Sequence, residues 1–419
     1  YSVPGIVFAH LMGGSISSKV MLLTPAFRNM DMALEEAAEV SGASKLRTML
    51  QVTLPVMLPP MLLVFMLNIV RIFQSFEIEQ ILGTPIGFFV FSTKIFQFVR
   101  EFDPPEYGQA TALASLTLVL IAGIIPLQRW LLSRRQYTTV TGRIRPGLID
   151  LGKWQPVVFW LIIGLVGLLT VVPILTLVGG SFMTRVGFFQ AVPTYTLNHW
   201  KEVLVEPVFI RALWTTAIIS LSTGLFSPFL FSILAYILVR TRWRGRTVLD
   251  SIFWMSAAIP GMLSGLGLLW MFLGTPGLSA IYGTIWALIL VVVLQGKLTG
   301  TQLFKAIYLQ MGSELEESAR TFGAGWWYTY FTIWLPLIMP TMILIGILNF
   351  VLAAQTTSSI ILLASRETIT LSILALEAMG GTNANYEQAG IVSLFIVSLT
   401  VVVAIVARSF GLKVGLHHQ

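Results

Sequence analysis

One stretch of the chain occurs twice. Residues 34–59 read LEEAAEVSGASKLRTMLQVTLPVMLP and residues 315–340 read LEESARTFGAGWWYTYFTIWLPLIMP, in a single register that places residue 34 over residue 315, an offset of 281. The identical positions are, in the numbers of the first copy, Leu34, Glu35, Glu36, Ala38, Gly42, Ala43, Thr48, Leu54, Pro55 and Pro59. Because glycine, prolines and paired acids recur at fixed spacing, the fold is expected to build the same turn-containing unit twice.

Each copy has the pattern of a short polar helix, a glycine turn and a hydrophobic helix, here called an elbow. In the second copy three apolar residues recur at i, i+4 and i+7 from Leu315, and acidic residues fill the first helical turn, where the helix dipole favours negative charge. Ser313 and Glu316 have capping-box spacing. Gly323 is placed to end the helix in a left-handed conformation, and Pro336 is expected near the start of the next helix because it lacks an amide donor. The sequence therefore predicts an acidic, water-exposed elbow between membrane helices, twice.

The composition is that of an integral membrane protein. Hydrophobic residues make up 56% and charged residues 11% of the chain, and the mean hydropathy is +0.83. Soluble domains carry roughly 25% charged residues. The chain has no cysteine, which excludes disulfides and thiolate metal sites.

The predicted fold is an all-α polytopic membrane protein, because apolar runs of about 20 residues cross roughly 30 Å of hydrocarbon. We expect about nine spans, at residues 3–26, 52–74, 107–132, 155–180, 208–239, 249–273, 280–308, 333–363 and 385–410. The predicted domains are 1–132, the C-terminal half of a first domain with its elbow at 34–59; 133–153, a basic cytoplasmic linker; and 154–419, a second, complete domain with its elbow at 315–340. The first domain then lacks about three helices, which would precede Tyr1. The segments 77–106, 181–207 and 364–384 are expected outside, the first with a re-entrant helix as an option.

Basic residues give both elbows one orientation. With the elbows inside, most of the 26 Lys and Arg residues also fall inside, including those of linker 133–153 and the turn that holds Arg240 and Arg242. The net charge of +7 is therefore explained by membrane topology, and no nucleic-acid partner is expected.

The elbow resembles the cytoplasmic Glu-Ala-Ala loop of permease subunits in bacterial ABC importers. It reads Glu36-Ala37-Ala38 with Gly42, Val52 and Leu54-Pro55 in the first copy, and Glu317-Ser318-Ala319 with Gly323, Ile333 and Leu335-Pro336 in the second. The resemblance implies the type I importer transmembrane fold in two pseudo-symmetric halves. It also implies a multi-pass location in the bacterial inner membrane, among membrane lipids.

In that family the loop docks on the ATPase subunit. The resemblance thus implies two copies of a cytoplasmic ATPase and a periplasmic or lipid-anchored substrate-binding protein as partners. The residues expected to couple to the ATPase are Glu35, Glu36, Ala38, Gly42, Leu54, Pro55, Glu316, Glu317, Ala319, Gly323, Leu335 and Pro336.

The chain lacks residue patterns for catalysis of its own. The Gly-Lys step at Gly296-Lys297 does not form a phosphate loop, because it is followed by Leu298 rather than Ser or Thr and lies inside a span. No nucleophile, base and orienting partner stand together, and the four histidines show no ligand spacing. We therefore expect a transport subunit with no catalytic or metal site and no bound cofactor, with ATP and magnesium on the partner ATPase.

Polar residues inside spans are candidates for the translocation pathway. Asn68 and Gln74 recur at the matched positions Asn349 and Gln355, and Lys297 lies in the span before the second elbow. Hydrogen bonding between helices and snorkelling are the alternative roles.

The second half resembles the ferric-iron permeases in four stretches: residues 195–200 (YTLNHW), 211–213 (RAL), 238–246 (LVRTRWRGR) and 259–261 (IPG). Ferric iron is thus the expected substrate; alternatives in related permeases are aminoethylphosphonate, thiamine, polyamines, sulfate or molybdate. A secondary transporter is the remaining alternative, but its repeats are often inverted, whereas both elbows here lie on one side. A channel is disfavoured because no stretch of the chain reads as a selectivity filter.

Overall fold

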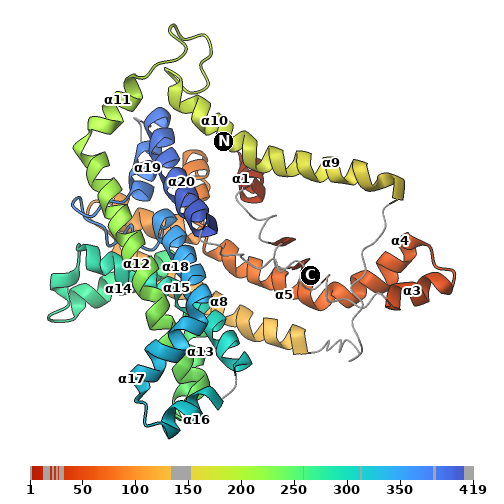
Figure 1. Ribbon diagram of the computed structural model, residues 1–419. Helices are drawn as coiled ribbons and strands as arrows, with labels where there is room; N and C mark the ends of the chain where they lie inside the picture. Colours follow the sequence, from red (N-terminus) through yellow and green to blue (C-terminus); the bar gives the residue numbers. More distant parts are fainter. Residues whose placement is uncertain are drawn as a thin grey trace. The chain divides into compact units, whose positions relative to one another are not determined.

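The computed structural model describes residues 2–12, 19–20, 23–24, 27, 33–133, 152–257, 259–311, 314–380 and 384–409. The chain divides into two compact units, Tyr1–Thr176 and Leu177–Gln419 (Figure 1). The predicted all-α class is confirmed: the described residues form helices, and their only strand-like pairing is an isolated bridge between Met183 and Tyr195.

The first unit is built around one elbow and the helix that follows it. The elements are α1 (Val3–His10), α3 (Ala33–Val40), α4 (Lys45–Thr48), a π-helical turn (Met49–Thr53), α5 (Leu54–Phe73), α6 (Glu77–Leu82), a 3₁₀ turn (Thr84–Ile86), α7 (Phe91–Phe96), a second π turn (Gln97–Glu101), α8 (Tyr107–Ser133) and α9 (Gln155–Val166). Helices α3 and α4 lie at one end of α5 (Figure 1), and α6 follows its other end. Helix α10 (Val172–Phe182) crosses the boundary between the units.

The second unit is larger. It comprises α11 (Asn198–Val205), α12 (Pro207–Arg240), α13 (Arg246–Ala257), α14 (Gly261–Gly274), α15 (Ile285–Gln310), α16 (Glu314–Thr321), α17 (Trp326–Thr329), a π turn (Tyr330–Trp334), α18 (Leu335–Gln355), α19 (Leu371–Met379) and α20 (Tyr386–Ser409). Helix α12 packs along both α15 and α18. Its crossing with α18 is close, because a Cβ added to Gly346 would lie 2.7 Å from the carbonyl oxygen of Gly224. Small residues allow this approach in membrane helices.

Five helical stretches in the described residues are long and apolar enough to cross a membrane. They are Gly152–Phe182, Pro207–Arg240, Ile285–Leu309, Trp326–Gln355 and Tyr386–Val406. These correspond to five of the expected spans. The count of nine is not confirmed. The expected span 249–273 is a pair of helices bent by 116°, and the expected spans 52–74 and 107–132 fall on α5 and α8, which are helices but are not among these five stretches. The expected span 3–26 and the linker 133–153 lie partly outside the described residues.

The expected span 333–363 and outside loop 364–384 are wrong in their boundaries. Helix α18 ends at Gln355, and the chain then turns back into the protein, where residues 359–364 and most of α19 are buried. The polar residues that suggest an exposed loop form hydrogen bonds inside the protein instead. The Ser372 hydroxyl donates to the carbonyl oxygen of Thr356 at 2.7 Å, and the Leu371 amide donates to the Thr216 hydroxyl at 2.9 Å. Buried backbone groups need such partners.

Candidate functional site: the two elbows

The glycine turn has the same structure in both elbows. Gly42 has φ +85° and Gly323 has φ +77°, as expected for a left-handed helix end. The amide of Ala43 donates to the carbonyl of Ala38, and the amide of Ala324 donates to that of Ala319, both at 3.0 Å. Together with the bonds from the glycine amides to residues 39 and 320, this is a Schellman cap in each copy.

The expectation that Pro336 stands near a helix start is confirmed, because Pro336 is the second residue of α18, although a longer helical stretch continues through it. The helical stretch runs from Trp326 to Gln355 and passes through Pro336. A π turn, Tyr330–Trp334, precedes the Leu-Pro step, and the first copy has an equivalent turn at Met49–Thr53 before Pro55. Proline lacks the amide of an α-helical bond and clashes with the preceding turn. The wider π turn accommodates it without ending the helix, in both copies.

The two acids of each elbow point to different surroundings. Glu316 is 8% exposed and accepts a hydrogen bond of 2.6 Å from the Tyr236 hydroxyl on α12, while Arg320 forms an ion pair with the same carboxylate at 2.5 Å. Glu317 is exposed. The prediction of a wholly water-exposed acidic turn is therefore wrong for Glu316, because α12 supplies a hydroxyl that sequence spacing does not reveal.

The first elbow repeats this arrangement within itself. Glu35, which matches Glu316, accepts a hydrogen bond of 2.5 Å from the Thr53 hydroxyl, and Glu36 is exposed like Glu317. Thr53 lies in the π turn, so the acid ties the polar helix to the helix that follows. In each copy, therefore, the first acid accepts a hydrogen bond from another residue of the protein, whereas the second acid is exposed.

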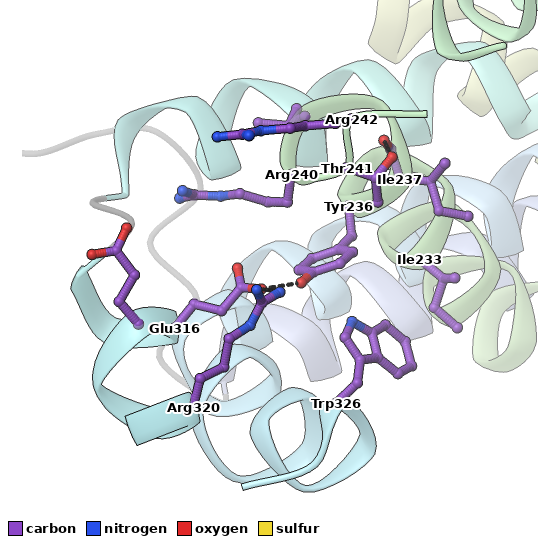
Figure 2. Close-up of a pocket in the computed structure, with 11 residues that line it drawn as sticks. Ile233, Tyr236, Ile237, Arg240, Thr241, Arg242, Glu316, Arg320 and Trp326 are labelled. Carbon is purple, nitrogen blue, oxygen red and sulfur yellow. Dashed lines mark hydrogen bonds and ion pairs between the residues drawn. The ribbon is translucent and has the colours of Figure 1, made fainter. Parts of the chain in front are cut away.

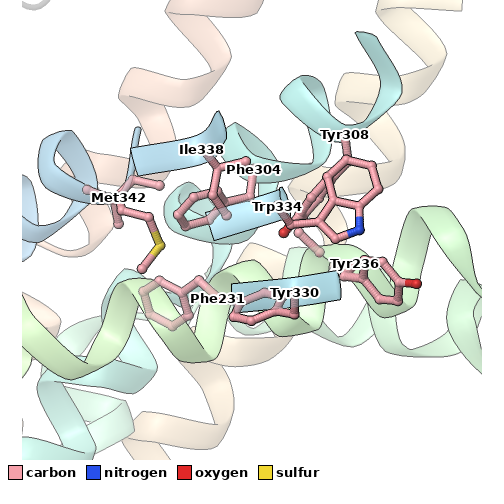
Figure 3. Packing of buried hydrophobic residues seen from close by; sticks show 10 residues of the cluster. Phe231, Tyr236, Phe304, Tyr308, Tyr330, Trp334, Ile338 and Met342 are labelled. Carbon is pink, nitrogen blue, oxygen red and sulfur yellow. The ribbon is translucent and has the colours of Figure 1, made fainter. Parts of the chain in front are cut away.

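The second elbow rests on aromatic side chains at the end of α12. The Trp326 ring stacks on Tyr330 with centroids 5.4 Å apart and meets Tyr236 edge-on at 5.5 Å. Tyr236 and Tyr330 belong to the buried cluster of Figure 3, which is formed by Phe231, Ala235, Tyr236, Phe304, Tyr308, Tyr330, Trp334, Ile338, Met342 and Ile345. Aromatic pairs of this geometry contribute about 0.5–1.5 kcal/mol beyond area burial, so the elbow is well anchored.

Arg240 fixes the end of α12 to the end of α15. Its guanidinium donates to the carbonyl oxygens of Tyr308 and Met311, at 2.9 and 2.5 Å, and lies 5.1 Å from the Trp334 ring. Figure 2 shows Arg240 beside Tyr236 and Glu316 in a pocket of about 860 Å³. Cations suit the carbonyls at a helix C-terminus.

Sequence reasoning missed Tyr236, Arg240 and Trp326 as parts of this site. The sequence places Arg240 in a basic inside turn. Its position at the end of an apolar run of about 30 residues is the signal that could have indicated a contact with a helix end. Tyr236, one turn earlier on the same helix face, carried no separate signal.

Within the second unit, the expected pathway residues Lys297, Asn349 and Gln355 lie in different surroundings. The Asn349 amide donates to the Ser227 hydroxyl at 2.7 Å and would contact a Cβ at Gly296, so it joins α18 to α12 and lies against α15. The Lys297 ammonium donates to its own helix, at the carbonyl of Leu294, 3.0 Å away. Gln355 is exposed at the end of α18. These contacts favour the helix-packing role for Asn349. In the other unit, Asn68 and Gln74 are each half-buried.

In the part of the chain that the structure describes, no three His, Cys, Asp or Glu side chains are grouped so that they could hold a metal ion. Of the four histidines, His417 and His418 lie outside that part of the chain.

The chain is similar in sequence to known transport proteins. The chain is 25% identical over 376 residues to the putative ferric transport system permease protein FbpB 1 of Haemophilus influenzae, covering 88% of this chain and 57% of that protein. It is 24% identical over 373 residues to the ferric transport system permease protein FbpB of Actinobacillus pleuropneumoniae, covering 88% and 53%. The chain thus spans about half the length of these curated relatives.

A solved structure shares the fold. The crystal structure of a bacterial ABC transporter involved in the import of the acidic polysaccharide alginate matches with a TM-score of 0.50 at 20% identity, over 63% of this chain and 96% of that one. The family model of the binding-protein-dependent transport system inner membrane component matches residues 2–137 and 228–413. Both elbows fall inside the matched ranges, and the chain belongs to this family of multi-pass inner membrane proteins.

Proposed function

We propose that this chain is a permease subunit of an ATP-driven importer of ferric iron. It forms the translocation path and couples that path to two cytoplasmic ATPase subunits. The observation that carries the proposal is the repeated elbow, in which the Schellman cap, the π turn and the inward first acid occur at the same positions of both copies. Two docking elements of the same design suit two copies of one partner.

The elbow has the parts that a mechanical coupling needs. Glu317 and Glu36 are exposed and available to a basic groove of the partner. Behind Glu317, the bond from Tyr236 to Glu316 ties α16 to α12, and Arg240 ties α12 to the end of α15. A displacement of the elbow is therefore passed to two long helices, which would rock between inward-open and outward-open states.

The substrate assignment is supported by the relatives named as ferric permeases, which match over 88% of this chain at 24–25% identity. A periplasmic binding protein would deliver the ion to the outer side of the membrane. ATP and magnesium would be bound and used by the ATPase subunits, so this chain is a transport subunit and not an enzyme.

Uptake of radiolabelled ferric iron tests the assignment. A strain without other iron importers would carry the complete transporter, with or without this permease. We expect uptake only with the permease present. Uptake of iron that is unchanged by the deletion, together with lost uptake of a phosphonate or thiamine, would assign the alternative substrate.

A further inference from the structure

A buried polar cluster lies at the end of α5 that is remote from the first elbow. The Glu79 carboxylate on α6 lies 2.7 Å from His10 Nε2 at the end of α1, and helices α1 and α6 pack together. The Ser75 hydroxyl donates to the other carboxylate oxygen at 2.5 Å and lies 3.5 Å from the same His10 nitrogen. Ligand-type atoms from two parts of the chain, the end of α1 and residues 75–79, thus converge. Sequence spacing hides this, since His10 and Glu79 are 69 positions apart.

The fold does not require this cluster, because the second repeat builds the same local backbone without it. In the first repeat the amides of Gln80 and Gly83 donate to the carbonyls of Phe76 and Glu79, at 2.8 and 2.9 Å. In the second, the same bonds recur 281 positions later, from residue 361 to 357 and from 364 to 360, at 3.0 and 2.8 Å.

At two of the three matched positions of the second repeat the side chains are apolar, while Ser75 corresponds to Thr356, which keeps a hydroxyl. His10 corresponds to Val291 and Glu79 to Ile360, and both of these are 0% exposed. Burial of a carboxylate and an imidazole costs free energy that an apolar pair avoids. The first repeat therefore keeps a costly polar group at a place where this fold accepts valine and isoleucine.

The chemistry of the cluster suits a hard or borderline metal cation. Carboxylate and hydroxyl oxygens favour hard cations, and imidazole is a ligand for iron. Two ligands about 2.1 Å from one ion at a right angle lie about 3 Å apart, so the observed 2.7 Å between nitrogen and oxygen needs only a small adjustment. The His10 side chain is 34% exposed and that of Glu79 only 5%, so an arriving ion meets the imidazole first.

We propose that His10, Ser75 and Glu79 form a transient binding site for the transported ferric ion, in the first repeat only. This rests on the proposed function. Three protein ligands leave the coordination shell incomplete, so water or a chelating anion completes it and the ion is released easily. Conduction requires such binding, strong enough to admit the ion and weak enough to let it leave. Since α6 follows the end of α5 away from the elbow, the site would lie on the side where the ion arrives.

The first test measures ion binding without transport. The complete complex, purified without its binding protein, is titrated with gallium(III) citrate, and the retained gallium is counted. Wild type should retain gallium. His10→Val/Glu79→Ile, which copies the second repeat, and Glu79→Gln, which keeps the shape of the side chain, should each weaken retention by at least about tenfold. His199→Val/Glu202→Ile removes another His–Glu pair, with atoms 3.8 Å apart, and should bind as wild type does.

The second test measures uptake of radiolabelled ferric iron by the same variants at matched membrane levels. Glu79→Gln and the double variant should lose most uptake, while the His199 control keeps it. Equal gallium retention and equal uptake in Glu79→Gln and wild type would overturn the site, and so would a wild-type complex that retains no gallium. A wild-type complex that retains gallium through Glu79 but imports no ferric iron would keep the site and reject the proposed substrate.

Discussion

The hydroxyl of Tyr236 donates to the Glu316 carboxylate at 2.6 Å, and this one bond joins the elbow helix α16 to the long helix α12. Glu316 is nearly buried, and Arg320 is its ion-pair partner on the solvent side. The bond crosses from an element that faces the proposed ATPase partner to one that packs along α15 and α18. It is therefore a direct polar connection between the elbow helix and the helices that would move.

Tyr236→Phe should uncouple the elbow without unfolding the protein. The change removes only the hydroxyl, so the ring keeps its edge-on contacts with Trp326 and Tyr308. Hydrogen bonds to charged groups contribute about 1.5–3 kcal/mol. We expect normal membrane levels, with iron uptake per ATP hydrolysed reduced severalfold.

Tyr328→Phe is the matched control, because Tyr328 is 65% exposed on the adjacent α17. It should behave as wild type does. If Tyr236→Phe also kept the wild-type ratio of uptake to hydrolysis, the bond would have no part in coupling.

Arg240→Lys should lower the stability of the second unit. Lysine keeps the charge but cannot place a planar fork of donors on the carbonyls of Tyr308 and Met311 while lying over Trp334. Loss of these charge-assisted bonds is expected to cost about 1–3 kcal/mol. Thermal denaturation in detergent should begin at a lower temperature, whereas Arg242→Lys, at an exposed position two residues on, should leave it unchanged.

Residues whose role is set by their own neighbours in the chain were predictable. The turns at Gly42 and Gly323 follow from local spacing, because a helix that ends in a left-handed residue selects glycine. The acidic first turn and the all-helical class follow equally from pattern and composition.

Roles that depend on distant partners were not predictable. Glu35 and Glu36 are adjacent and chemically alike, yet only Glu35 meets a hydroxyl, that of Thr53. The inward turn after Gln355 looks like an exposed loop in sequence because its hydroxyl groups are polar, while their partners lie more than ten residues away. Burial of such residues is decided by packing between elements, which a single sequence does not display.

Gly323→Ala should strain the elbow at a single backbone position. A Cβ there meets nothing within 4 Å, so its cost comes from the positive φ alone, about 1–2 kcal/mol for a residue other than glycine. We expect normal membrane insertion, since each span satisfies its own backbone hydrogen bonds. Transport should fall because the docking helix ends in the wrong direction.

Gly325→Ala provides the control for Gly323→Ala. Gly325 has φ −70°, and a Cβ there also meets nothing within 4 Å, so this variant adds the same methyl group without strain. Equal transport by the two alanine variants would show that transport does not depend on the left-handed turn at residue 323.

Glu317→Lys should weaken attachment of the ATPase, because Glu317 is the exposed acid of the second elbow. Truncating one partner of a buried charge pair across an interface typically costs about 2–5 kcal/mol, and a reversed charge adds repulsion. The ATPase should be largely lost when the variant complex is purified in detergent, while the permease remains at its normal level in the membrane. Glu314→Lys makes the same charge change at an exposed position in the same turn and separates a specific contact from a general loss of negative charge. Retention of the ATPase in Glu317→Lys and in the equivalent Glu36→Lys would mean that neither elbow docks on it. Loss in Glu314→Lys to the same extent would mean that the turn acts through its summed charge rather than through Glu317.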